Sequence, residues 1–336
     1  MILLWHPSIT KAQSLERFEF REPHLGTVVE LTLYASDETV ANDSARAAFA
    51  RIEELNRIFS DYIPDSEVMQ LCRMSGTGQA VRVSPELFEV LERSIEISKA
   101  TEGAFDVSIG PVVKVWRSAR RLRKLPPAEQ LEEARQRVGW QQIILDPAAR
   151  TVELRKRGML LDFGGIAKGF IADQVRTVLK GRGTRHCLVA VAGDIAAGDS
   201  PPGRDGWRIG VAPLDKPNGL PSRYLRLVNS SISTSGDAFQ FVEIDGVRYS
   251  HIVDPATGLG LTRRSSVTII APQGVAADGL ATAISILGPD RGLKLIDQTK
   301  GAAALVVLAG ENGVTATEST GFAKFVLPTD ADARRD

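Results

Sequence analysis

The sequence predicts an α+β fold with a mainly antiparallel sheet and inserted helices, built as a single compact two-lobed unit. The predicted strands come largely as hairpins, and Asp245-Gly246 between two of them is a typical two-residue hairpin turn. Helices fall between groups of strands rather than after each strand, which disfavours a doubly wound parallel sheet. No linker divides the chain, so we expect an N-terminal arm at residues 1–22 and one domain at residues 23–330.

The first predicted elements follow from periodicity and helix-end signals. Residues 27–34 alternate and are rich in β-branched side chains, which predicts a strand. An apolar stripe from Ala45 to Phe59 predicts a long amphipathic helix. Ser84-Pro85 begins another helix, because a capping serine precedes a proline in the first turn, and Gly103 ends it.

The second half of the chain predicts shorter elements. Pro126-Pro127 opens a polar helix that runs to Gly139, and further helices are expected at about 166–180, at about 275–287 and near Arg291. Ser233 to Gly236 is interpreted first as a turn. Short strands are expected at Ile143–Leu145, Thr151–Leu154, Cys187–Val191, Arg208–Val211, Phe239–Ile244, Arg248–Ile252, Val267–Ile270 and Ala304–Leu308.

Bulk composition narrows the classes of partner. With 41 basic and 41 acidic residues the net charge is zero, which argues against a nucleic acid or anionic membrane bound by overall charge. Every apolar run is cut by charge or glycine, so no membrane span is expected, and Met1 to Trp5 is too short for a signal peptide. We therefore expect a cytoplasmic protein, or an exported one if an upstream signal was removed. Cys72 and Cys187 are expected to be buried or half-buried thiols.

A glycine pair marks a possible anion site. Gly164-Gly165 lies between an apolar strand end and a helix start, and Lys168 follows in the first helical turn. Glycines allow a ligand close to the backbone, and a helix N-terminus offers unpaired N–H groups to an anion. The spacing fits neither a Walker loop nor a dinucleotide fingerprint. From these residues alone, a phosphate site and a simple tight turn both remain open.

Two oxygen-bearing side chains lie four residues apart on a predicted helix. Residues at this spacing share a face, so the Asp278 carboxylate and the Thr282 hydroxyl can meet one cation. Hard oxygen ligands suit Mg²⁺, which takes its other ligands from water and substrate phosphate. A helix-capping aspartate beside a buried threonine is the plainer alternative.

His251, one of four histidines, lies just past the Asp245-Gly246 hairpin and three residues before Asp254. A histidine in a strand is more often a hydrogen-bonded packing residue, and it acts as a general base only if it reaches the reacting hydroxyl. The segment from Thr101 to Asp106, taken alone, is typical of a helix end with a packed phenylalanine.

Taken together and in order, these segments resemble the ApbE family of FAD:protein FMN transferases. The resemblance covers about residues 24–327, nearly the whole chain. It rests on Gly26-Thr27, Phe59–Tyr62, Thr101–Pro111, Asp162–Gly169, Ile232–Gly236, Ser250–Gly258 and Ala277–Thr282.

The resemblance implies a function. Family members are similar in binding FAD with Mg²⁺ in a cleft, cleaving its pyrophosphate and esterifying the FMN phosphate to a Thr or Ser of an acceptor protein, with release of AMP. Acceptors share an Asp-x-x-[Ser/Thr]-Gly-Ala-[Thr/Ser]-like motif that this chain lacks, so a separate acceptor protein is expected. Two alternatives remain: a Mg²⁺-dependent FAD pyrophosphatase, and a non-catalytic FAD-binding carrier. Asp278, Thr282 and His251 together argue against the carrier, since storage needs neither a base nor a metal.

The resemblance also implies roles for individual residues. His251 is the implied base, oriented by Asp254, and the metal ligands are Asp278, Thr282 and the backbone carbonyl of Gly165. The implied flavin and adenine contacts are Leu25, Tyr62, Ala104, Phe105, Asp106, Asp162, Lys168 and Val253.

Three positions depart from the family's pattern. Leu25 stands where Met is common, a roughly volume-conserving exchange. Ala281 stands where some members carry an acid, so the metal site here has one ligand fewer. Lys168 stands where others have an acid, which makes its role less defined than its location.

Overall fold

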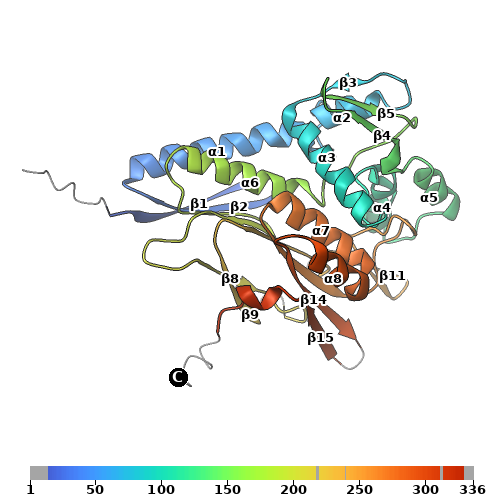
Figure 1. Ribbon diagram of the computed structural model, residues 1–336. Coiled ribbons are helices and arrows are strands. Elements are labelled where there is room, and N and C mark those ends of the chain that lie inside the picture. The colour runs from blue at the N-terminus through green and yellow to red at the C-terminus, as the bar shows by residue number, and fades with distance from the viewer. Residues whose placement is uncertain (1–13, 217–218, 239, 311–312, 329–336) are drawn as a thin grey trace, which may run out of the picture.

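The computed structural model describes residues 14–216, 219–238, 240–310 and 313–328. At its centre lies an eight-stranded antiparallel sheet with the strand order β1-β2-β6-β7-β10-β13-β14-β15 (Figure 1). This sheet with its inserted helices confirms the predicted α+β class. Its strands are β1 (Glu16–His24), β2 (Thr27–Ala35), β6 (Cys187–Val191), β7 (Asp194–Ala197), β10 (Ser231–Gly236), β13 (Ser265–Ala271), β14 (Ala303–Gly310) and β15 (Gly313–Glu318).

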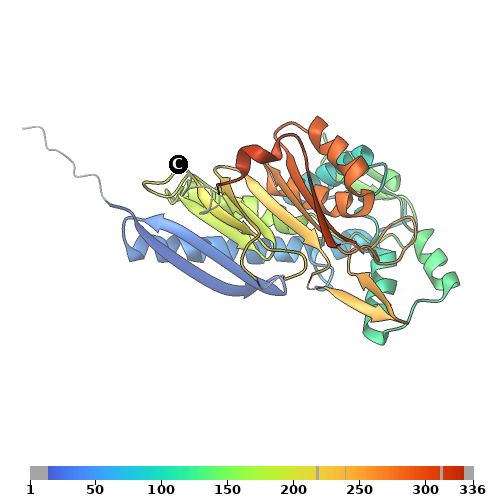
Figure 2. The ribbon, with the colours of Figure 1, turned by 90° about the horizontal axis from the view of Figure 1, so that it is seen from below.

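Helices cover one face of this sheet, and a small hairpin covers the other (Figures 1 and 2). Apolar side chains of β2 and β6 pack against α1 and α6, and those of β13 and β14 pack against α7 and α8. The opposite face packs on β8 and β9, so all seven residues of β13 are buried. The helices are α1 (Glu38–Phe59), α6 (Ala167–Gly181), α7 (Gly274–Leu287) and α8 (Pro289–Gln298), and the hairpin strands are β8 (Trp207–Val211) and β9 (Arg223–Leu227).

The remaining elements gather at one end of the sheet, beside the helical layer (Figure 1). In this region α4 and α5 pack on the hairpin of β11 and β12 in a separate apolar cluster. The elements of this end region are α2 (Glu67–Arg73), α3 (Pro85–Ala100), α4 (Gly110–Leu122), α5 (Ala128–Arg135), β11 (Phe241–Ile244), β12 (Val247–Ser250), and a sheet of β3 (Val81–Arg82), β5 (Thr151–Leu154) and β4 (Ile143–Asp146).

The predicted N-terminal arm at residues 1–22 is wrong where the structure describes it. Residues 16–22 belong to β1, which pairs with β2 along its whole length. The segment is polar because β1 is an edge strand, and only Phe18 and Phe20 among its apolar residues pack on the core. Residues 1–13, and residues 329–330 at the end of the predicted domain, lie outside the described residues.

Other predicted elements shift or change type. Ser233 to Gly236 is not a turn but part of the central strand β10, where the Thr234 and Thr268 hydroxyls hydrogen-bond at 3.0 Å. The helix predicted up to Gly139 ends at Arg135, and α4 was not anticipated at all. Phe239, in a predicted strand, lies outside the described residues. The start of α3 is confirmed, since the Ser84 hydroxyl accepts from the backbone N–H of Leu87 at 3.2 Å.

Helices α6 and α7 cross with their backbones in contact. A β-carbon on Gly169 would clash with the carbonyl oxygen of Gly274, and one on Gly274 would clash with that of Gly169. The Asp173 carboxylate of α6 caps α7 from outside, accepting from the N–H groups of Gly274 at 2.5 Å and Val275 at 3.4 Å. Because Gln273 at the N-cap makes no side-chain cap, Asp173 replaces it and fixes the two helices together.

In the parts of the chain that the structure describes, no helix combines the length and the apolar character needed to span a membrane.

Candidate active site

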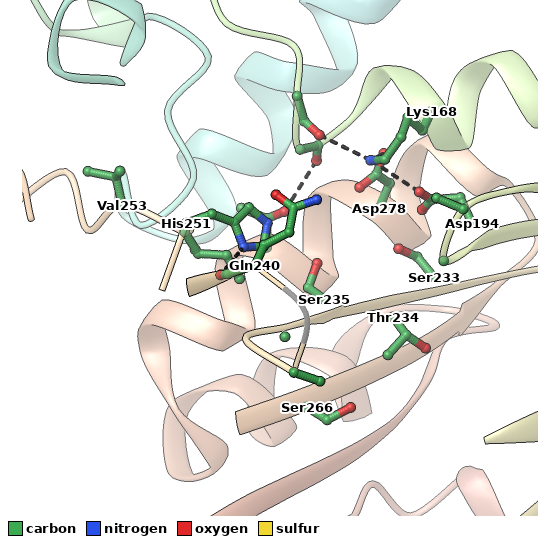
Figure 3. A pocket seen from close by; sticks show the side chains of 18 of the residues that line it. Lys168, Asp194, Ser233, Thr234, Ser235, Gln240, His251, Val253, Ser266 and Asp278 are labelled. Carbon is green, nitrogen blue, oxygen red and sulfur yellow. Dashed lines mark hydrogen bonds and ion pairs between the residues drawn. The ribbon is translucent and has the colours of Figure 1, made fainter. Parts of the chain in front are cut away.

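A cavity of about 840 Å³ lies where the large sheet meets the smaller region at its end. Its walls come from the start of α6, from α4 and α7, from β10 and from the segment after β12, so distant stretches of the chain converge there (Figure 3). This volume is within the usual range for sites that enclose a ligand of cofactor size. With the exception of Asp254, every residue implied by the family resemblance lines it.

Lys168 lies between two buried carboxylates in this cavity (Figure 3). Its Nζ is 3.1 Å from Asp194 Oδ2 and 3.6 Å from Asp278 Oδ2. Burial alone would lower the pKa of Lys168, but the two carboxylates outweigh it and raise the pKa. For Asp278, burial and the neighbouring Asp194 raise the pKa, and the Lys168 charge opposes them. Two acids share one ammonium, which leaves the cluster net negative when both are ionised.

The oxygens expected to bind a metal converge beside this cluster. Asp278 lies inside α7 and is 2% exposed, so it does not cap its own helix. Its Oδ2 accepts from the backbone N–H of Gly169 at 3.1 Å, in the first turn of α6. Thr282 Oγ1 lies 3.5 Å from the carbonyl oxygen of Gly165, and a β-carbon on Gly165 would come within 2.7 Å of that hydroxyl.

This donor set fits a hard divalent cation. It consists of carboxylate, hydroxyl and carbonyl oxygens, the ligands that Mg²⁺ prefers. One further carboxylate oxygen, Asp194 Oδ1, is buried without a hydrogen-bond partner among the described residues. No group of three or more His, Cys, Asp or Glu side chains in that same part of the chain is arranged to hold a metal.

Arg117 of α4 contacts three residues of the cavity wall near the glycine pair. Its Nη2 donates to Asp162 Oδ2 at 2.8 Å, its Nη1 pairs with Asp61, and its guanidinium lies 4.8 Å from the ring centroid of Tyr62. Asp162 also accepts from the backbone N–H of Gly164 at 2.8 Å. Tyr62 is 76% exposed and lines the cavity.

The other implied flavin contacts form the apolar part of the wall. Leu25 comes from the β1–β2 turn, where its φ of 55° and that of 70° at Gly26 are typical of a type I′ turn. Phe105 and Val253 are buried, and Ala104 lies beside them in the lining. Asp106 also lines the cavity, but its carboxylate is already occupied. That carboxylate accepts from the N–H and hydroxyl of Ser108 and from the N–H of Trp140.

His251 follows β12 and lines the cavity. Its Nδ1 lies 3.2 Å from the backbone carbonyl oxygen of Gln240. A carbonyl only accepts, so in the neutral ring Nδ1 carries the hydrogen and Nε2 keeps its lone pair. Burial, together with the positive charges of Arg120 and Lys168, lowers the pKa of His251 to about 4.

Asp254 makes its hydrogen bonds within the turn that follows His251. Its carboxylate accepts from the backbone N–H of Ala256 at 2.9 Å, and its own N–H donates to the carbonyl of Leu259. These bonds close the turn after His251, and the group facing the His251 ring is the Gln240 carbonyl. In this structure the Gln240 carbonyl, rather than the Asp254 carboxylate, faces His251 Nδ1, and the orienting role of Asp254 stays a prediction.

Sequence reasoning missed several residues of the cavity. Arg117 and Asp194 belong to its charge network, and Trp116 joins α4 to the segment carrying His251 by donating from Nε1 to the Ser250 carbonyl at 3.2 Å. One signal was present in the sequence: Gly193-Asp194 places an acid directly after a glycine turn and before an apolar run. Nothing local in the sequence distinguishes Arg117 from its basic neighbours on α4.

Comparison with known proteins agrees with this geometry. The model of the ApbE family matches residues 25–306. The FAD:protein FMN transferase of Haemophilus influenzae is 32% identical over 285 residues, which cover 82% of this chain and 81% of that protein. The Treponema pallidum protein of the same name is 31% identical, covering 84% of this chain and 82% of its own.

Solved structures show the same fold. The flavin transferase ApbE from Vibrio cholerae superposes with a TM-score of 0.82 at 27% identity, covering 93% of this chain and all of that one. The ApbE protein from Thermotoga maritima gives a TM-score of 0.82 at 28% identity, with the same coverage. Fold and site thus define an enzyme of the flavin transferase class. The chain belongs to the ApbE family.

Proposed function

We propose that this chain binds FAD in the cavity and catalyses Mg²⁺-dependent transfer of the FMN half to a Thr or Ser hydroxyl of a separate acceptor protein, with release of AMP. The observation that carries the proposal is one cavity that joins a cation site, a lysine and a histidine with a free Nε2. A carrier needs neither a base nor a metal.

The cavity offers matching surfaces to both parts of FAD. The exposed Tyr62 ring and the buried Phe105 give planar and apolar contacts for the aromatic ring systems. We expect the diphosphate to lie at the glycine pair, where backbone can approach closely and the Lys168 ammonium supplies a positive charge. Arg117 holds Asp162 and Tyr62 in place, so we assign it a positioning role.

The reaction balances as a phosphoryl-type transfer. The acceptor oxygen forms a bond to the FMN phosphorus, the pyrophosphate P–O bond breaks, and AMP leaves with the electron pair. His251 Nε2 takes the proton of the acceptor hydroxyl, while its Nδ1–H stays on the Gln240 carbonyl. Because the ring is neutral, it can accept that proton at physiological pH.

Charge on the phosphate oxygens must be stabilised during this transfer. Asp278, Thr282 and the Gly165 carbonyl would hold the Mg²⁺, which when bound neutralises charge on the diphosphate. Lys168, held between Asp194 and Asp278, keeps a fixed positive charge in the same place. Its raised pKa keeps it protonated.

Product analysis tests this proposal. The purified chain is incubated with FAD, Mg²⁺ and a domain that carries an Asp-x-x-[Ser/Thr]-Gly-Ala-[Thr/Ser] segment, and AMP and free FMN are separated and quantified. We expect AMP to form without an equal amount of free FMN, and only with metal present. Equal AMP and FMN would indicate the pyrophosphatase instead. FAD bound stoichiometrically without metal and without turnover would favour the carrier.

A further inference from the structure

Asp194 is a buried carboxylate, and one of its two oxygens has no hydrogen-bond partner among the described residues. It is 3% exposed at the start of β7, directly after the turn at Gly193. Its Oδ2 is bound by Lys168 at 3.1 Å, whereas Oδ1 is buried and meets no hydrogen-bond partner among the described residues. Leaving a charged oxygen buried and unpaired is costly, so such an atom needs an explanation.

The position of Asp194 points to the cation site. It lines the same cavity as the Gly165 carbonyl and Thr282, and it shares the Lys168 ammonium with Asp278 (Figure 3). Asp194 and Asp278 lie close to each other, because both carboxylates contact the same Lys168 Nζ, at 3.1 Å and 3.6 Å. With one lysine between them, the two ionised acids carry an uncompensated negative charge, which a further cation would balance.

We propose that Asp194 is a further ligand of the metal site. Its Oδ2 accepts from Lys168, and its Oδ1 binds the divalent cation held by Asp278, Thr282 and the Gly165 carbonyl. This inference rests on the proposed magnesium dependence and adds a residue to it. It accounts for the Asp194 Oδ1 atom that has no hydrogen-bond partner among the described residues. It also makes Asp194 the link between the cation and the lysine expected at the diphosphate.

The rival role for Asp194 is to orient Lys168 alone. Asp194→Asn separates the two roles, because the amide oxygen still accepts from Lys168 while the negative charge is lost. Asp61→Asn is the matched control: Asp61 also lines the cavity and is also paired with a basic side chain, Arg117, but it lies outside the cation cluster.

The experiment titrates Mn²⁺, as a Mg²⁺ substitute, into the FAD-free chain of residues 1–336 and its variants, with bound metal followed by electron paramagnetic resonance. Loss of an outer-shell partner of a metal site typically costs about 10- to 100-fold in metal affinity, and loss of a direct ligand should cost at least as much. We expect that loss for Asp194→Asn and a change of less than about threefold for Asp61→Asn, whose charge is screened by its arginine. Equal affinities for native protein and Asp194→Asn would overturn the proposal.

A second variant distinguishes a direct effect on metal binding from a loss of binding caused by misfolding. Asp194→Cys offers a thiolate, which favours soft Cd²⁺ over the hard cations. We expect this variant to bind Cd²⁺ more tightly relative to Mn²⁺ than native protein does, and Asp61→Cys to leave that ratio unchanged. If the native protein binds Mn²⁺ but Asp194→Cys has the same ratio of Cd²⁺ to Mn²⁺ affinity as native protein, this inference alone is rejected. Native protein that takes up no metal, with or without FAD, would reject both this inference and the magnesium proposal.

Discussion

At the scale of single residues, His251 is held by a backbone carbonyl rather than by an acid. The Gln240 carbonyl fixes the hydrogen on Nδ1 and leaves Nε2 free, and no carboxylate is needed to stabilise the ring in its resting form. The low pKa follows from burial and from nearby positive charges. An anionic diphosphate bound in the same cavity would raise that pKa, so substrate itself would strengthen the base.

His251→Ala should slow FMN transfer by about a hundred- to ten-thousand-fold, the usual contribution of a general base, while FAD affinity stays nearly unchanged. His186→Ala is the control, because His186 also faces a backbone carbonyl, that of Ser200, but does not line the cavity. Transfer rates come from single-turnover assays and affinity from flavin fluorescence. A large loss of FAD binding in His251→Ala would make His251 a structural residue.

The same histidine predicts a dependence of stability on pH. Its pKa is lowered from 6.5 to about 4 on folding, so the unfolded chain binds the proton more readily between those values. The stability linked to His251 is present above about pH 6.5 and is lost as pH falls toward 4. Between pH 7 and pH 5, the free energy of unfolding measured with urea should fall less for His251→Gln than for native protein. Equal losses would mean that His251 is not buried in its neutral form.

Asp278→Ala should abolish metal-dependent turnover, because it removes the buried carboxylate between the first turn of α6 and Lys168. The measurement is AMP release as a function of Mg²⁺ concentration. Activity retained at near-normal Mg²⁺ would remove Asp278 from the ligand set.

At the scale of elements, the crossing of α6 and α7 places the metal oxygens. Gly165, Lys168 and Gly169 lie at the start of α6, Asp278 and Thr282 lie on α7, and the two backbones touch at Gly169 and Gly274. The Asp173 carboxylate of α6 also holds this pair together, by accepting from the N–H of Gly274. The positions of the metal ligands therefore depend on the Gly169–Gly274 backbone contact, which leaves no room for a side chain at either residue.

Gly274→Ala should lower the free energy of unfolding by about 1–3 kcal/mol, the usual cost of forcing extra volume into a packed contact. It should also weaken Mn²⁺ binding, because α7 moves relative to α6. Gly181→Ala, at the end of α6 with open space around the added methyl, is the control and should be neutral or slightly stabilising. Chemical denaturation and Mn²⁺ titration check both effects. Unchanged stability of Gly274→Ala would show that the helices are not in contact there.

At this scale the sequence predicts helices better than strands. Helix α3 was identified by its serine cap and proline start, and α6 by the glycine pair before it. Strand β10 was taken for a turn because Ser233 and Thr234 suit turns locally, while a central position in the sheet buries Ser233 through long-range pairing. Strand β1 was missed because an edge strand can remain polar.

At the scale of the whole molecule, the site joins stretches that are distant in the sequence. Leu25, Tyr62, Lys168, His251 and Asp278 all line one cavity, although no local spacing relates them. Family resemblance brought them together in the sequence analysis, but it gave no contacts between them. Arg117 and Asp194 could not be assigned in this way, because their importance arises from the partners that folding supplies.

The intact mass of an acceptor domain after incubation with this chain, FAD and Mg²⁺ tests the central claim most directly. Controls are a chelator and an acceptor whose motif Thr or Ser is replaced by Ala. We expect a gain of one FMN by the native acceptor only, dependent on metal and accompanied by one AMP. AMP release with no mass gain by any acceptor, or a mass gain that survives chelation, would contradict the account.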